Sequence, residues 1–349
     1  MRATQPRGMI GIVTTLVLLG CLFVALPVSA APDTPANPIM VPNPGTDLWN
    51  AVRQRQGQMA GNTQARGVDA GVLINRSGED FRQYRRHDFI GAAGWFIAGT
   101  VGVILLFFLI RGRVRIPDGR SGRKIRRFVE YERIVHWLTA ALFVFLAVTG
   151  LTLLFGRFVI LPVFGPEAFG VIASACKEGH NLFGPLFLVS ILLLLFHWAA
   201  QNLPARGDLK WLIKGGGIVG SAHVTAGYFN TGEKLWYWGV ILLGLAVSIS
   251  GLVLVFPVFG QGRDIMQLAL IVHGIVAVLF IAGSFGHIYI GTIGSEGSLE
   301  GMTTGYVDEN WAKAHHDRWY AEVKNQPQPP AHESAGSDRV PLQPSTRKA

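Results

Sequence analysis

The fold is decided by the stretch IVHGIVAVLFIAGSFGHIY, residues 271–289, which carries a histidine near each end and no Asp, Glu, Lys or Arg. It lies in an apolar run, 266–290, that is long enough to cross a hydrocarbon core of ~30 Å as a helix. His273 and His287 are 287 − 273 = 14 residues apart, which is ~21 Å along a helix axis and close to four whole turns. The sequence therefore predicts a membrane helix that presents two imidazoles on one side at two depths.

Further apolar runs of this kind precede it. With about 20 residues for each crossing, spans are predicted at 89–110, 134–155, 182–200 and 235–256, in addition to 266–290. The composition agrees, because only 15% of the 349 residues are charged, 50% are hydrophobic and the mean hydropathy is +0.34, which is too apolar for an ordinary soluble enzyme. We predict an all-α membrane protein with a four-helix core, 134–290, and one additional N-terminal transmembrane helix, 89–110.

The loops give the orientation. Residues 111–133 hold nine arginines and lysines against three acidic residues, so this basic loop is predicted to stay in the cytoplasm. Residues 201–234 and the tail, 291–325, carry further basic residues and fall on the same side. This distribution accounts for the net charge of +9 and argues against a nucleic-acid partner.

The N-terminus has the pattern of a secretory signal peptide, 1–30, with cleavage predicted after Ala30; an uncleaved signal anchor is the alternative. Residues 31–88 are polar, are predicted to lie on the exported, periplasmic side, and show no core of their own. The C-terminus, 326–349, is rich in Pro, Ser and charge and is predicted to be disordered. The two cysteines are Cys21 and Cys176, and loss of Cys21 with the signal leaves no internal disulfide and no cysteine-ligated iron–sulfur cluster.

Histidines carry the chemistry, since an ionisable side chain is costly inside a membrane. By depth, His136 and His287 share the cytoplasmic level, and His180 and His273 share the exported level. Neutral imidazole is a normal axial ligand of haem iron, and two histidines on one iron suit electron transfer. The pairs therefore predict two haems b. The alternative is that such histidines only form hydrogen bonds between helices, and His197 could compete with His136 for the place opposite His287.

Small residues near these histidines could make room for a flat macrocycle, although close helix packing would also use them. They are Gly184, Gly274, Gly283 and Gly286.

Four histidine neighbourhoods resemble those that hold the haems of the respiratory formate dehydrogenase gamma subunit, a dihaem cytochrome b556. They are Arg133-Ile134-Val135-His136-Trp137, Gly179-His180-Asn181-Leu182-Phe183-Gly184, Leu270-Ile271-Val272-His273-Gly274 and Gly286-His287-Ile288-Tyr289. The tail is similar at matching spacing, through Gly297-Ser298, Gly301-Met302, Gly305-Tyr306-Val307, Trp311-Ala312-Lys313 and His315-His316-Asp317-Arg318-Trp319-Tyr320. The resemblance covers about 126–322 and implies that the four paired histidines, and not His197, are the ligands.

The resemblance also implies a quinone site, for menaquinone or ubiquinone, beside the cytoplasmic haem. Residues 228–234, YFNTGEK, resemble the family's Asn-x-Gly-Gln-Lys stretch, which assigns Asn230, Gly232 and Glu233 to this site next to His287. Glu233 departs from the family's glutamine, which puts the route of proton delivery in doubt. The alternative for 230–232 is a turn and helix cap.

The implied function is that of an electron-transfer subunit in the bacterial inner membrane, which does not itself oxidise formate. A molybdenum or tungsten partner subunit would oxidise formate in the periplasm and pass electrons through an iron–sulfur subunit to the exported haem. The cytoplasmic haem would then reduce quinone with cytoplasmic protons. The signal peptide and first span match a longer bacterial form of the family. Alternatives are the cytochrome b anchor of a nickel–iron hydrogenase or thiosulfate reductase and, from a different class, a haem-free membrane anchor or transporter.

Overall fold

The computed structural model describes residues 59–60, 72–74, 76–217 and 225–326. The expected signal peptide, most of the expected exported segment and residues 327–349 lie outside them. The described residues belong to two units, each of which is described by itself. One comprises the described residues up to Gly78 together with Phe256–Arg263, and the other comprises residues from Glu79 to Val255 together with those from Asp264 onward.

The smaller unit contains a short antiparallel pair of strands and a turn. Strand β1 (Met59–Ala60) pairs with β2 (Val72–Ile74), with Met59 opposite Ile74. In the turn at 256–263, the side-chain amide of Gln261 donates a hydrogen bond to the carbonyl of Phe256 at 2.8 Å. Strands of two or three residues cannot enclose a core, so the described residues of this unit form local structure only.

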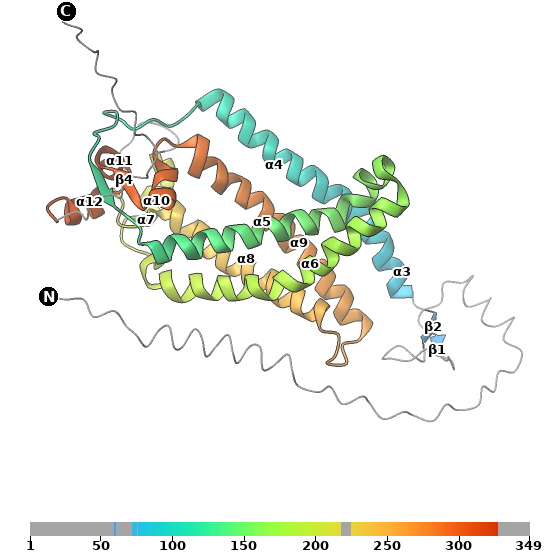
Figure 1. The fold of residues 1–349 in the computed structure, drawn as a ribbon. Coiled ribbons are helices and arrows are strands. Elements are labelled where there is room, and N and C mark those ends of the chain that lie inside the picture. Colours follow the sequence, from blue (N-terminus) through green and yellow to red (C-terminus); the bar gives the residue numbers. More distant parts are fainter. Residues whose placement is uncertain (1–58, 61–71, 75, 218–224, 327–349) are drawn as a thin grey trace, which may run out of the picture. The chain divides into compact units, whose positions relative to one another are not determined.

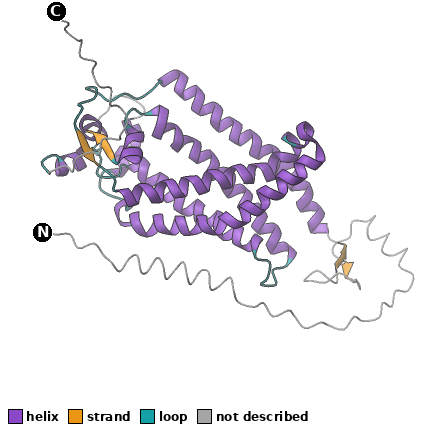
Figure 2. Cartoon of the chain, in the orientation of Figure 1, coloured by secondary structure: helices purple, strands orange, loops and turns teal. Residues whose placement is uncertain are grey.

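The larger unit is helical (Figure 1), and the prediction of an all-α membrane fold is confirmed. Strands in the described residues are no longer than three residues (Figure 2). Five helical segments of the described chain are long and apolar enough to cross a membrane, at 77–111, 130–159, 161–198, 231–255 and 263–294. The helices within them are α3 (Arg76–Gln83), the π-helix η1 (Tyr84–Phe89) and α4 (Ile90–Arg111), followed by α5 (Glu130–Val159), α6 (Leu161–Trp198), α8 (Thr231–Val255), α9 (Arg263–Tyr289) and the π-helix η4 (Ile290–Gly294).

Helix α6 differs from the prediction. We expected a connection between spans over 156–181 and a span from Leu182, but α6 begins at Leu161 and continues to Trp198 with a kink at Gly165. Gly165 has φ 79° and ψ 172°, and Pro166 opens the straight part of the helix after it. A helix from Pro166 to Trp198 is ~50 Å long, so it extends well beyond the ~30 Å apolar layer. Hydropathy located the crossing, and the polar stretch KEGHN, residues 177–181, concealed the helix that continues before it.

The first span also begins earlier than the expected Phe89. Helix α3 and the π-helix η1 extend α4 toward the N-terminus as far as Arg76, and the charged sequence of η1, YRRHDF, explains why hydropathy excluded it. The side chains of α4 are largely exposed, and that of Trp95 is 81% exposed. Exposed apolar surface on this scale is typical of contact with lipid.

Helices α5, α6, α8 and α9 form the core bundle. Its interior is a cluster of buried apolar side chains contributed by all four helices: Val135, Phe187, Ile191, Leu194, Trp198, Ile241 and Phe280. Helices α6 and α8 approach closely because a Cβ on Gly244 would lie only 2.7 Å from Cδ1 of Ile191. Such close packing through a small residue is the usual means of joining helices in a membrane.

The C-terminal tail folds onto the basic loop at one end of this bundle (Figure 1), which we call the tail end; the other is the distal end. Strand β3 (Lys124–Arg126), just before α5, pairs antiparallel with β4 (Tyr306–Asp308). Three short helices complete the tail, namely α10 (Ser298–Thr304), α11 (Glu309–His315) and α12 (Asp317–Val323). The remaining short elements, η2 (Ala200–Asn202), α7 (Asp208–Ile213) and η3 (Gly215–Gly217), lie between α6 and α8.

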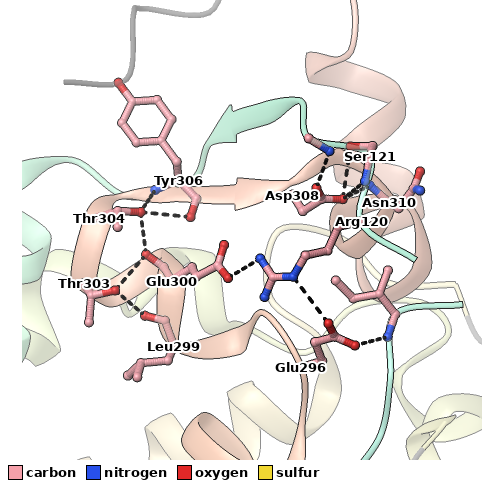
Figure 3. Close-up of polar contacts among 12 residues, drawn as sticks. Arg120, Ser121, Glu296, Leu299, Glu300, Thr303, Thr304, Tyr306, Asp308 and Asn310 are labelled. Carbon is pink, nitrogen blue, oxygen red and sulfur yellow. Dashed lines mark hydrogen bonds and ion pairs between the residues drawn. The ribbon is translucent and has the colours of Figure 1, made fainter. Parts of the chain in front are cut away.

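Polar contacts hold the tail in place (Figure 3). Arg120 forms ion pairs with Glu300 at 2.6 Å and with Glu296 at 3.3 Å. The carboxylate of Asp308 caps α11 by accepting from the backbone N–H of Asn310 at 2.9 Å, and it also accepts from that of Ser121 at 3.2 Å. The loop before the first core helix and the segment after the last are therefore joined.

Candidate functional site

The structure brings the paired histidines together at two levels of the bundle. At the tail end, the rings of His136 on α5 and His287 on α9 have centroids 6.3 Å apart. At the distal end, the rings of His180 on α6 and His273 on α9 have centroids 6.0 Å apart. Metal–imidazole bonds of about 2 Å on both sides of one ion would place the two ring centres about 6 Å apart. Each pair is thus spaced for one shared metal ion.

Hydrogen bonds at the distal pair define which ring nitrogen faces that ion. The Thr149 hydroxyl donates to the carbonyl of Phe145 at 2.9 Å, so it accepts from Nδ1 of His180 at 2.8 Å. Nδ1 of His273 donates to the carbonyl of Val247 at 2.9 Å, since a carbonyl can only accept. Both imidazoles carry the proton on Nδ1, which leaves the lone pair of each Nε2 free to bind a metal ion. Such bonds behind a ligand hold its ring in orientation.

Two glycines make room for these rings. A Cβ on Gly150 of α5 would lie 3.3 Å from Cε1 of His180, and one on Gly251 of α8 would lie 3.1 Å from Cε1 of His273. The residue before Gly251 is Ser250, whose hydroxyl lies 3.3 Å from Nδ1 of His273, as Thr149 precedes Gly150. Sequence reasoning missed both positions. The repeated hydroxyl–glycine pair on two spans was the available signal.

A cavity of about 310 Å³ opens beside the distal pair. Its walls are mainly apolar side chains of the four core helices, with additional residues from α3 and η1. The Ser248 hydroxyl lines it and is buried with no hydrogen-bond partner. At Gly184, which also lines it, an added Cβ would meet nothing within 4 Å. The residues therefore fit a flat apolar group that carries the metal between two histidines.

The glycines noted in the sequence divide into two groups. A Cβ on Gly274 would collide with the ring of Phe89, and one on Gly283 would lie 3.0 Å from Trp236, so aromatic side chains already occupy those spaces. Gly184 and Gly286 have nothing within 4 Å of an added Cβ. Of these four glycines, only Gly184 lines the distal cavity with no side chain already filling the space beside it.

The tail-end pair has an aromatic environment. The indole of Trp236 stacks on His287 with a centroid distance of 4.9 Å and an interplanar angle of 14°. Nδ1 of His136 is buried and has no hydrogen-bond partner. Between the two levels, Trp236 contacts the ring of Phe280 at 6.2 Å, and Phe280 lines the distal cavity. Aromatic side chains thus connect the two histidine pairs.

His197 does not lie against His287. Its Nε2 is 3.2 Å from the carboxylate of Glu132, and its ring packs against Tyr131 and Trp198. The Trp198 indole N–H donates to the same carboxylate oxygen of Glu132 at 3.2 Å. The structure therefore gives His197 a polar partner on α5, where the sequence alone left it as a competitor of His136.

The segment 230–233 begins helix α8. The side chain of Asn230 accepts from the backbone N–H of Glu233 at 2.9 Å, and the Glu233 carboxylate accepts from that of Asn230 at 2.8 Å. This reciprocal pair is a capping box. Gly232 lets Trp211 approach, because a Cβ would lie 3.0 Å from its ring. The cap that was the alternative to a quinone site is therefore present, and the quinone role of these residues stays a prediction.

Arg127 connects this segment to the tail. Its side chain is only 2% exposed and forms an ion pair with Glu233 at 3.0 Å. The guanidinium also lies 5.1–5.4 Å from the ring centroids of Phe128, Tyr228, Trp311 and Trp319, close enough for cation–π attraction. The sequence analysis noted the tail motif but did not identify Arg127 as the cation that its rings surround, because these rings come from three separate segments.

Two tail histidines lie beside this arginine. Burial lowers the pKa of His315 to about 4 and that of His316 well below its usual value, and the nearby charge of Arg127 adds to both shifts. Nδ1 of His316 lies 2.8 Å from the carbonyl of Gly227. Both side chains are therefore neutral near pH 7 and belong to the packing of the tail.

Within the described ranges, no group of three or more His, Cys, Asp or Glu side chains is placed to hold a metal ion. A histidine pair with no further protein donor suits an iron whose other ligands belong to a macrocycle. Two such pairs in one four-helix membrane core define a b-type cytochrome.

The chain belongs to the prokaryotic cytochrome b561 family, which matches residues 127–305. Membership of this family implies haem b, and with the five apolar spans it indicates an integral membrane protein.

Its relatives include cytochrome b556 subunits of formate dehydrogenase. The Escherichia coli K12 cytochrome b556(fdo) subunit is 32% identical over 204 residues, which are 57% of this chain and 93% of the relative. The nitrate-inducible b556(Fdn) subunit of the same strain is 27% identical over 199 residues, 55% of this chain and 88% of the relative. A Haemophilus influenzae formate dehydrogenase cytochrome b556 subunit is 30% identical over 199 residues, 54% and 79% respectively. These relatives confirm the resemblance inferred from the sequence.

Proposed function

We propose that this chain is the membrane cytochrome b subunit of a formate dehydrogenase and passes electrons through two haems b to quinone. The observation that carries the proposal is the presence of two facing histidine pairs, 6.3 Å and 6.0 Å between ring centroids, with one member of each pair on α9. The names of the relatives support the formate dehydrogenase assignment over a hydrogenase or thiosulfate reductase anchor.

The four histidines would act as axial ligands. Haem b, when bound, supplies one-electron redox chemistry. His180 and His273 would hold one haem and His136 and His287 the other, and two histidines on each iron would leave no position for oxygen, which suits electron transfer. Thr149 and the Val247 carbonyl keep the Nε2 atoms of the distal pair turned toward the metal.

The proposed direction of electron flow is argued from the distribution of charge and from the relatives. The loop before α5 is rich in arginine, so the tail end would face the cytoplasm of a bacterial inner membrane. The distal pair would then lie near the exported side, where a molybdenum or tungsten subunit and an iron–sulfur subunit would deliver electrons from formate. The tail-end pair would serve quinone, with protons from the cytoplasm.

A quinone site at 230–233 is supported by its neighbours. Trp236, one turn into α8 from Glu233, stacks on His287, so this helix start is next to the tail-end ligand. The cap uses the oxygen of the Asn230 amide, and its NH₂ group is the donor we assign to a quinone oxygen. Glu233, held by Arg127, would serve as the nearby proton carrier.

The test is a reduced-minus-oxidised optical spectrum of the purified full-length chain, with a haem count per polypeptide. Two low-spin b haems are expected. His273→Ala should remove the distal haem and leave the tail-end haem, and His287→Ala should do the reverse. A colourless protein would refute the proposal, and full occupancy in either variant would refute the pairing.

The partner needs a separate measurement. In native membranes, formate should reduce the b haems within the time of substrate turnover. Hydrogen should not reduce them, and thiosulfate should not reoxidise them once they are reduced. Reduction by hydrogen alone would instead make the chain a hydrogenase anchor.

A further inference from the structure

We propose that the helical segment 81–89, which precedes the family region, forms part of the distal haem site, and that Arg85 binds a propionate carboxylate of that haem. This inference rests on the proposed function, because it takes the His180–His273 pair as a haem site. It gives a role to a part of the chain that lies outside residues 127–305, the range that the family matches.

The cavity supplies the first observation. Besides residues of α5, α6, α8 and α9, its wall contains side chains from the end of α3 and from η1: Phe81, Tyr84, Arg85 and Phe89. Phe81, Arg85 and Phe89 are spaced by four residues and Tyr84 is next to Arg85, which places them on one side of the helix. The first span is therefore more than an additional membrane crossing, since its beginning completes the wall around His180 and His273.

The local backbone and packing indicate that the contact between segment 81–89 and the distal site is a regular part of the fold. Residues Tyr84–Phe89 form a π-helix, a conformation that is rare and is frequently found at functional sites. The ring of Phe89 lies against Gly274, where a Cβ would come within 2.8 Å of it. Gly274 directly follows the ligand His273. Phe89 thus fixes this segment at the residue beside the haem ligand.

Charge indicates what Arg85 recognises. Among the side chains that line the cavity, Arg85 is the only arginine or lysine, and none is a carboxylate. A haem b placed between the two histidines has an apolar ring, which suits the aliphatic and aromatic wall, and two propionates that need a polar partner. Arginine binds carboxylates with two parallel hydrogen bonds. Exposure of Arg85 at the rim of the cavity suits a group that must remain near water.

The electrostatic consequence can be measured. A positive charge beside a haem stabilises the reduced form, which has one electron more, so removing it lowers the midpoint potential. The two haems are distinguishable because each is lost separately when its own histidine is replaced. We would therefore measure redox titrations of the purified full-length protein for Arg85→Gln and, as matched control, Arg86→Gln. Arg86 belongs to the same π-helix and carries the same charge, and it is not among the residues that line the cavity.

Arg85→Gln should shift the distal haem to a lower potential and leave the tail-end haem unchanged, and Arg86→Gln should leave both close to the wild type. Equal behaviour of the two variants would overturn the assignment of Arg85. If the wild-type protein holds no distal haem, the proposed function fails, and this result is distinct from the failure of the inference.

A second pair of variants tests the wall itself. Phe89→Ala should lower the amount of distal haem that remains after purification, because it removes the ring packed on Gly274. Phe96→Ala, a control on the same span that is 48% exposed and does not line the cavity, should retain the full amount. Equal haem content in both variants would refute the role of the segment as a wall.

Discussion

Replacing Gly251 by alanine is the most direct test of the geometry around His273. The added Cβ would lie 3.1 Å from Cε1 of His273, so the ring must retreat by a few tenths of an ångström. It cannot swing aside freely, because Nδ1 is bound to the Val247 carbonyl at 2.9 Å. A shift of this size is comparable with the ~0.2 Å tolerance of a metal–ligand distance. Overpacking of this kind costs about 1–3 kcal/mol, which corresponds to roughly 5- to 150-fold weaker haem binding at this site.

The assay is a haem count with optical spectra during a titration with a haem-free acceptor protein. The matched control is Gly239→Ala, on the same helix, where an added Cβ would meet nothing within 4 Å. Both variants gain the same ~1 kcal/mol of helix propensity, so only the contact with His273 differs. The distal haem should dissociate more readily in Gly251→Ala alone. Equal retention in the two variants would show that the glycine is not required by the ligand.

Three further changes have defined outcomes. Thr149→Val removes the acceptor of the His180 Nδ1–H at 2.8 Å and should weaken distal haem binding about tenfold or more, as measured by haem loss, whereas Thr152→Val on the same helix should not. Arg127→Met leaves Glu233 without its ion pair and removes a guanidinium that is 2% exposed. Because the Glu233 side chain is 36% exposed, the cost comes mainly from the lost packing and hydrogen bonds of the buried guanidinium, about 1–3 kcal/mol. It should be seen as a lower unfolding temperature in detergent, and an unchanged transition would contradict a structural role of Arg127. His315 has a folded pKa of about 4 against 6.5 unfolded, so the unfolded tail binds more protons between these values and stability falls as pH drops from 6.5 toward 4. Limited proteolysis of the tail should accelerate over this range, and the effect should weaken in His315→Gln.

Histidine pairing could be predicted because depth in a membrane follows from counting. His273 and His287 lie on one continuous apolar helix, so their separation determines two levels, and the positions of His136 and His180 in their spans then select their partners. The structure places both pairs as counted. His197 could not be excluded in this way, because what distinguishes it is a contact with Glu132 on another helix.

Features that depend on neighbours from distant segments were not predictable. Hydropathy reports where charged residues interrupt an apolar run. It therefore ended the first span at the charged residues of η1 although the helix reaches back to Arg76, and it ended the third span at 177–181 although α6 begins at Leu161. Gly150 and Gly251 are ordinary small residues in sequence, and they matter only because an imidazole from another helix approaches each of them. The rings around Arg127 likewise come together only when the tail folds back.

The pairing of β3 with β4 implies an order of events during synthesis of the chain. Lys124–Arg126 emerges from the ribosome before any core helix, and its partner, Tyr306–Asp308, emerges after all of them. The surroundings of Arg127 are therefore completed last, and a chain cut before Tyr306 would contain all five spans yet leave this arginine without the rings of Trp311 and Trp319. The tail end of the bundle can therefore close only after the C-terminal tail has been synthesised.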